Sequence, residues 1–125
     1  MTAETGTLNA GGGTIENNAA CATVNNEGAT LTHAAGAVTN MYLNGGTTYF
    51  NATATTGTIY VRPDATLDFS QDSRTKTISN PIQVSKGAVV RDPNGVVTNL
   101  RLYYVNCRPE DVTFQGPPNK TATWA

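Results

Sequence analysis

The residues best suited to chemistry are three aspartates spaced four positions apart, because paired carboxylates act in polysaccharide hydrolysis and bind cations. The cluster consists of Asp64, Asp68 and Asp72, with Ser70 and Ser73 beside them. Asp68 stands between Leu67 and Phe69, so the alternation of a strand turns its side chain outward. Asp64 falls in a predicted turn. We therefore expect solvated surface acids beside Arg62 and Arg74, with a weak cation site or a carboxylate pair as the alternative.

The one histidine and the two cysteines form no motif that is typical of catalysis or metal binding. His33 lies in Thr-His-Ala-Ala-Gly, without the nucleophile and carboxylate that a catalytic triad requires. Cys21 and Cys107 have no CxxC spacing, which indicates buried reduced thiols, with a disulfide or metal pair as the alternative. We therefore predict no catalytic, cofactor-binding or metal-ligating residue, and expect that the protein is not an enzyme.

The composition limits the elements that could position such residues. Of the 125 residues, 14% are charged and 7% are aromatic, the formal net charge is −1, and Thr, Ala, Asn and Gly supply about half of the chain. Few long helix formers and many turn residues favour an all-β domain. The charge argues against a nucleic-acid partner. Without a run of about 18 apolar residues or a signal-like N-terminus, we expect no membrane partner and synthesis in the cytoplasm.

A short phrase recurs along the chain and is the strongest signal in the sequence. It consists of an apolar residue, a turn rich in Asn, Gly, Asp or Pro, a small residue, and then alternating apolar positions. The five copies are residues 8–15, 24–31, 43–49, 61–67 and 84–90. A preserved phrase at irregular spacing is typical of a repeating coil with loops inserted on one side.

Stacking the copies at the spacing of parallel strands predicts which side chains fill the interior. One interior column is predicted to contain Leu8, Val24, Leu43, Val61 and Val84, and a second to contain Ile15, Leu31, Tyr49, Leu67 and Val90. The column of small residues between them, at a crowded corner, is Gly13, Ala29, Thr47, Ala65 and Ala88. Outward Thr and Asn side chains are expected to form ladders along the stack.

The predicted fold is therefore all-β, a short parallel β-helix or solenoid of about five rungs. The body spans residues 1–102, and residues 103–125 depart from the repeat. A β-sandwich or jelly roll with strands every 8 to 12 residues is the alternative, because it also suits a chain of this length.

The last segment, 103–125, is aromatic and contains several prolines. Its two interpretations are a cap that folds over the end of the solenoid and an assembly arm that docks into another subunit. Aromatic residues carry a large share of interface energy. The candidate interface residues are Tyr103, Tyr104, Phe114 and Trp124.

Phrases such as residues 22–32 and 57–69 resemble the rungs of two groups of proteins: β-helical structural proteins of tailed-bacteriophage virions and autotransporter adhesin passengers. A small chain is more similar to a capsid cement or decoration protein. This resemblance implies a structural protein on the capsid surface of a virion that forms homo-oligomers, as a trimer, and contacts the major capsid protein. It implies no catalytic residue.

A second function is compatible with the same residues, that of an adhesin or carbohydrate-binding module of a tail fibre or surface protein. Aromatic side chains stack on sugar rings in such proteins. The candidates for stacking are Tyr42, Tyr49, Tyr60, Tyr103 and Trp124.

Overall fold

The computed structural model describes residues 6–117 and the strand at 123–124, and within them the protein is built from short parallel strands. The strands are β1 (Thr7–Ala10), β2 (Thr14–Asn17), β3 (Cys21–His33), β4 (Val38–Phe50), β5 (Thr56–Val61), β6 (Thr66–Asp68), β7 (Ile82–Val84), β8 (Val89–Arg91), β9 (Arg101–Tyr104), β10 (Thr113–Gln115) and β11 (Thr123–Trp124). A single 3-10 turn, η1, covers Pro109–Asp111. The prediction of an all-β fold is confirmed.

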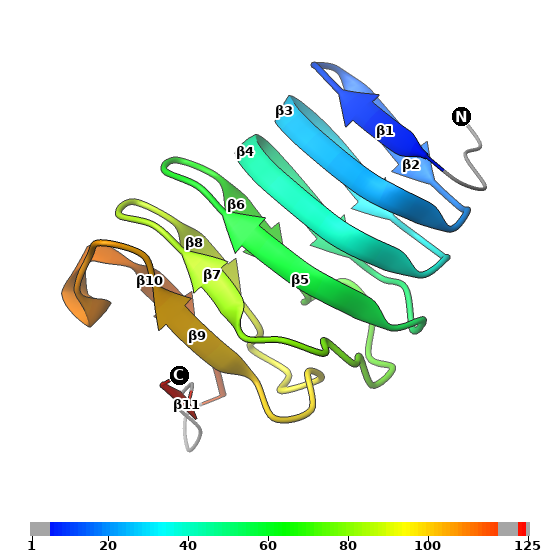
Figure 1. The fold of residues 1–125 in the computed structure, drawn as a ribbon. Coiled ribbons are helices and arrows are strands. Elements are labelled where there is room, and N and C mark those ends of the chain that lie inside the picture. The colour runs from blue at the N-terminus through cyan, green and yellow to red at the C-terminus, as the bar shows by residue number, and fades with distance from the viewer. Residues whose placement is uncertain (1–5, 118–122, 125) are drawn as a thin grey trace.

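Successive coils stack into a β-solenoid of about five turns (Figure 1). Every strand pairing in the described residues is parallel. Each coil gives one strand to a first sheet, turns a corner, and gives one strand to a second sheet. The first sheet contains β1, the first half of β3, the first half of β4, β5, β7, β9 and β11, and the second contains β2, the second halves of β3 and β4, β6, β8 and β10. The solenoid prediction is thus confirmed over the β-sandwich alternative.

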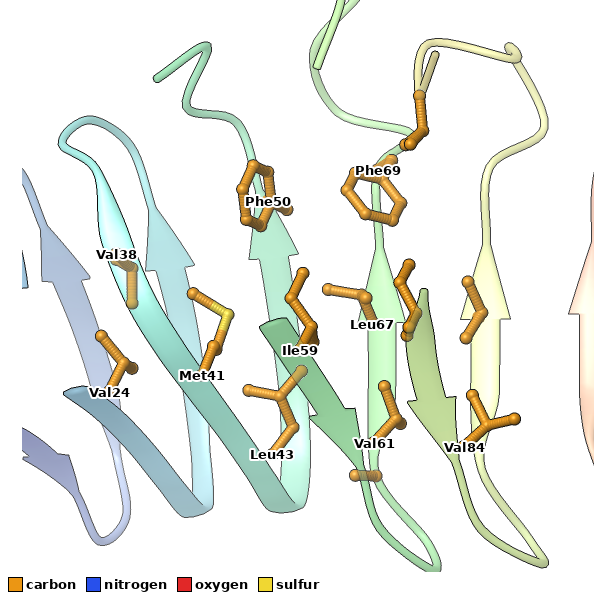
Figure 2. Close-up of a cluster of buried hydrophobic side chains, with 14 of the residues drawn as sticks. Val24, Val38, Met41, Leu43, Phe50, Ile59, Val61, Leu67, Phe69 and Val84 are labelled. Carbon is orange, nitrogen blue, oxygen red and sulfur yellow. The ribbon is translucent and has the colours of Figure 1, made fainter. Parts of the chain in front are cut away.

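The interior holds columns of stacked side chains, as the alternation predicted, and Figure 2 shows part of them between the two sheets. Counted along the pairings, the first-sheet columns are Leu8, Val24, Met41, Ile59, Ile82 and Leu102, and then Ala10, Asn26, Leu43, Val61, Val84 and Tyr104. The second-sheet column is Ile15, Leu31, Thr48, Leu67, Val90 and Phe114.

Three positions of the two predicted columns of large apolar residues are wrong. Leu8 and Val24 stack on Met41 and not on Leu43. The reason is that the last inward residue before the corner is Ala10 in the first coil and the fully buried Asn26 in the second. Neither is a large apolar residue. The prediction therefore aligned Leu8 and Val24, which lie two residues before Ala10 and Asn26, with Leu43.

Tyr49 is the third error, since Thr48 occupies its predicted place in the interior and is fully buried. The corner of β4 is one residue shorter than the corner between β5 and β6. Asn26 makes Thr48 acceptable in the core, because its Nδ2 atom donates to Thr48 Oγ1 at 3.0 Å. A buried hydroxyl that has a hydrogen-bond partner avoids most of the cost of leaving water.

The corner between the sheets holds the predicted column of small residues, with one change. Ala29, Ala65 and Ala88 are buried there, but the third coil contributes Gly46 and not Thr47. Gly46 has φ of +66°, and a Cβ atom at this position would lie 2.7 Å from the carbonyl carbon of Gly28, and closer still to the carbonyl oxygen of Ala29. Only glycine fits this backbone conformation and this close approach of two successive coils.

The stack continues past residue 102, the boundary expected from the sequence, which falls inside β9. β9 pairs with β7, β10 pairs with β8, and β11 pairs with β9. Phe114 packs against the core as the last member of its column. Residues 113–115 and the strand at 123–124 therefore belong to the solenoid and not to an arm.

Outward side chains form the expected ladders. Asn25 Nδ2 donates to Asn9 Oδ1 at 2.9 Å, from one coil to the next. On the second sheet, threonines face outward at one position of successive coils, namely Thr14, Thr30, Thr47, Thr66 and, after Val89, Thr113.

A charge in an interior column should unfold the protein. Val61 is fully buried between Leu43 and Val84. Val61→Asp would place a carboxylate without a partner there, so we expect the variant to lack the cooperative thermal transition that we expect of the wild type. Thr53→Asp, in an exposed loop, is the control and should melt like the wild type. A cooperative melt of Val61→Asp near the wild-type temperature would contradict the column assignment.

Candidate functional site

The carboxylate of Asp68 does not form a catalytic pair with another acid. Its Oδ2 atom lies 2.6 Å from Nη1 of Arg91 on the next coil, and its Oδ1 atom accepts the amide of Ser70 at 2.8 Å. Asp68 points outward as predicted, but it is only 3% exposed, so the expectation of a solvated acid is wrong here. The Asp68–Arg91 pair connects β6 to β8 and stabilises their register.

Asp72 stands in a different environment, in the long loop between β6 and β7. Its carboxylate forms ion pairs with Nη2 of Arg74 at 2.6 Å and with Nζ of Lys76 at 2.8 Å. The hydrogen bonds from Arg74, followed by that from Lys76, hold the pKa of Asp72 well below its usual range. Lys76 is fully buried, and burial of its charge depends on this carboxylate. Asp64 lies exposed in a turn at φ of +67°, as predicted.

The three aspartates therefore serve separate structural purposes. Asp68 pairs with the next coil and Asp72 neutralises a buried lysine, while Asp64 lies in the β5–β6 turn. Asp92, in the turn Asp92-Pro-Asn-Gly after β8, is 1% exposed and accepts the amides of Val96 and Val97 at 2.9 and 3.2 Å. Within residues 6–117 and 123–124, no three acidic, histidine or cysteine side chains are grouped to hold a metal ion.

His33 is a core residue of the second sheet. It is fully buried, and its ring meets Phe50 edge-on with centroids 5.1 Å apart. The amide nitrogen of Asn17 lies 3.1 Å from Nδ1; because that nitrogen only donates, Nδ1 accepts and the proton resides on Nε2. Nε2 has no hydrogen-bond partner in the described part of the chain. Burial lowers the pKa of His33 to about 4.

Neither Cys21 nor Cys107 forms a disulfide, and neither thiol is activated as a nucleophile. Cys21 is buried, as predicted, whereas Cys107 is partly exposed, contrary to the expectation. Burial raises the pKa of both thiols, which disfavours the reactive thiolate. Cys107 Sγ donates to the carbonyl of Val84 at 3.6 Å.

The outer surface of the first sheet carries aromatic and amide side chains that are aligned from coil to coil. Along this surface, which we call the tyrosine face, one outward column contains Asn9, Asn25, Tyr42, Tyr60, Gln83 and Tyr103. The rings of Tyr42 and Tyr60 are stacked, with centroids 4.7 Å apart and planes 7° from parallel. This separation equals the distance between neighbouring strands. The guanidinium of Arg62 lies 5.6 Å from the Tyr60 ring.

The strands β5, β7 and β9 run side by side in the first sheet (Figure 1). An open hollow of about 270 Å³ lies on the tyrosine face over these strands. Its lining residues are Thr58 on β5, Asn80 and Pro81 directly before β7, Gln83 on β7, and Tyr103 on β9. Asn80 Nδ2 donates to Thr58 Oγ1 at 2.9 Å and to the carbonyl of Gly57 at 3.3 Å. None of the five lining side chains carries a charge.

The four residues predicted to form an interface all lie on β9, β10 and β11, but they occupy different surfaces. Tyr103 points outward and is 49% exposed, as part of the hollow. Tyr104 and Phe114 are partly buried at the last coil. Burial raises the pKa of Tyr104 to about 12. The backbone of Trp124 pairs with Leu102, and its side chain lies outside the described residues.

Sequence reasoning missed the roles of Thr58, Asn80, Pro81 and Gln83. Thr58 and Asn80 are 22 residues apart and meet only because the loop before β7 returns to the edge of β5. Tyr42, Tyr60 and Tyr103 were candidates for stacking, and an alignment of the coils by register would have placed them in one column with Gln83.

No protein-family model, curated protein or solved structure matches the chain. In the described residues, no helix is long and apolar enough to cross a membrane.

The buried His33 predicts a pH dependence of stability. The unfolded chain takes up a proton on this residue near pH 6.5, whereas the folded protein resists protonation until about pH 4. The unfolded state therefore binds more protons between these values, and stability falls as the pH is lowered through them, by roughly 3 kcal/mol in total. His33→Leu should remove this loss, which thermal melts between pH 6.5 and 4 would measure.

Thr32→Val, an outward change on the same strand, is the control and should retain the wild-type pH dependence. Equal losses of stability in the wild type and His33→Leu over this range would contradict the assignment.

Proposed function

We propose that the chain is a non-enzymatic structural protein of a tailed-phage virion, a capsid cement protein that forms a trimer and bridges neighbouring major capsid subunits at the capsid surface. The observation that carries this proposal is the apolar end of the solenoid. Tyr104, Val112 and Phe114 pack against the core but are only partly buried. No described strand follows β10 in the second sheet, so within residues 6–117 and 123–124 the column ends at Phe114.

The uncovered end favours association with another protein surface. The edge of a stack presents unpaired main-chain groups together with the apolar ends of its columns, and solenoids cover such ends with caps or partners. A second subunit that covers Val112 and Phe114 would bury apolar area and satisfy the free edge of β10 in one contact.

The charge distribution supports an ordered contact between copies. Residues 1–61 contain three Glu and no Lys or Arg, for a net charge of −3, whereas residues 62–125 contain 8 basic and 6 acidic residues, for a net charge of +2. Because coils stack in chain order, this asymmetry runs along the axis of the solenoid. A contact between the acidic surface of one subunit and the basic surface of the next is heterologous, and such contacts close a ring of three only if each rotates the next subunit by about 120°.

The use of the ionisable groups supports a structural function. Asp68 and Asp72 are engaged in ion pairs, and His33 is fully buried with a lowered pKa. A catalytic acid or base needs access to a substrate and a pKa near the working pH. Asp68 and His33 are buried, and the pKa of Asp72 is held well below its usual range.

The second candidate function is that of an adhesin or carbohydrate-binding module. The specific observation in its favour is the tyrosine face, which brings three of the five predicted stacking residues, Tyr42, Tyr60 and Tyr103, into one column beside a hollow. Tyr49 lies on the second sheet, away from this column.

The cement proposal predicts a trimer in solution. Analytical ultracentrifugation of the full chain should give a mass about three times 13.1 kDa. Val112→Asp, at the uncovered end, should shift the protein toward monomer, because a charge disfavours burial at an apolar contact. Thr113→Asp, on the neighbouring exposed position, is the control. Added trimer should also bind capsids of the phage that encodes the chain and raise their melting temperature. A monomer that leaves these capsids unchanged would contradict the proposal.

A further inference from the structure

We infer that the hollow formed by Thr58, Asn80, Pro81, Gln83 and Tyr103 binds one neutral pyranose ring of a glycan. This inference rests on the second candidate function and locates its site. It does not depend on the cement proposal, because the hollow lies on the outer surface of the first sheet and not at the end of the stack.

Tyr103 supplies the surface on which a sugar ring can stack. Its side chain is 49% exposed, the one large hydrophobic side chain in the described residues with such exposure. The faces of Tyr42 and Tyr60, in contrast, are turned toward each other at 4.7 Å. The negative face of an aromatic ring attracts the polarised C–H groups on one side of a pyranose. Tyr103 is thus the ring of the column that is available to a ligand.

Gln83, Asn80 and Thr58 supply hydrogen-bonding groups around this ring. The amide of Gln83 has no hydrogen bond to the described residues and is half-buried, so both its donor and its acceptor are available. Asn80 uses Nδ2 for Thr58 and Gly57, which fixes the amide and leaves Oδ1 as an acceptor. The hydroxyl of Thr58 accepts from Asn80 and can still donate. Planar amides match the paired donor and acceptor groups of adjacent sugar hydroxyls.

The size and charge of the hollow restrict the ligand to a small neutral ring. A volume of about 270 Å³ lies just below the range of roughly 300–1,000 Å³ that drug-sized ligands occupy. The lining side chains are uncharged. Arg101, two residues before Tyr103 on β9, directs Nη2 to the carbonyl of Ser79 at 3.2 Å. Rings before and after the bound one would extend over the tyrosine face, where Asn25, Tyr42 and Tyr60 continue the column.

The rigidity of the scaffold favours binding by these groups. Thr58, Gln83 and Tyr103 stand on three neighbouring strands whose inward neighbours Ile59, Ile82 and Leu102 are at most 1% exposed. Side chains on a fixed backbone lose less conformational entropy when a ligand binds. The hollow is therefore largely formed before the ligand arrives.

Saturation-transfer NMR with the methyl glycosides of glucose, galactose, mannose and N-acetylglucosamine tests this site on the full chain. We expect transfer to the ring protons of at least one glycoside, together with shifts of the Asn80 and Gln83 side-chain amide signals. Tyr103→Ala should weaken binding about tenfold or more. Tyr103→Phe keeps the ring and should retain binding, and Tyr49→Ala, which removes an outward ring of the second sheet, should bind like the wild type.

Absence of transfer to all four glycosides, or transfer that Tyr103→Ala leaves unchanged, would overturn the inference. Binding of methyl glucuronide alone would also overturn it, because the site would then select a charge. If Tyr103→Ala abolishes trimer formation while no glycoside binds, the hollow is a protein contact and not a sugar site. Ultracentrifugation of the same variants separates these outcomes from failure of the cement proposal.

Discussion

The main chains of successive coils approach one another closely at the corner between the two sheets, and the rest of the structure depends on this contact. Buried Ala29, Ala65 and Ala88 line the corner. Gly46 completes it where even a methyl group would overlap the preceding coil. With the corner narrow, the columns of the first and second sheets pack against each other and exclude water. A larger residue would separate the sheets and remove contacts from several columns at once.

Polar residues stabilise the interior positions, turns and loops where no large apolar side chain is present. Asn26 replaces an apolar residue before the second corner, where its Oδ1 accepts the amides of Gly28 and Ala29 at 3.1 and 2.7 Å and its Nδ2 reaches Thr48. Asp92 orders the turn after β8 in the same way. The ion pairs of Asp68 and Asp72 connect the coil to its neighbour and to its own loop. With these groups engaged in the fold, the outer surfaces and the ends of the stack remain for binding, which is the basis of both proposed functions.

Much of the fold could be predicted from the sequence, because alternation and the repeated turn phrase follow directly from strand geometry and tight corners. The coils that contain Val61 and Val84 were placed in the correct register. The predicted register of the first two coils was wrong because the inward position before the corner is occupied there by Ala10 and Asn26. In later coils a large apolar residue at this position makes it recognisable in the sequence. The hollow could not be predicted, since Asn80 belongs to an inserted loop whose path is set by tertiary contacts with β5. The ion pair of Asp68 with Arg91 also spans 23 residues and depends on the length of that insertion.

The stability of two glycine variants tests the stacking of the corner most directly. Gly46→Ala adds a methyl group where the preceding coil lies and forces alanine to a φ of +66°, so we predict a loss of at least about 2 kcal/mol in the free energy of unfolding. Gly11→Ala, at the corner of the first coil, meets no atom within 4 Å and should change that free energy by less than about 0.5 kcal/mol. Chemical denaturation of both variants gives the two values. Equal stability of Gly46→Ala and Gly11→Ala would contradict the stacked corner on which this structure depends.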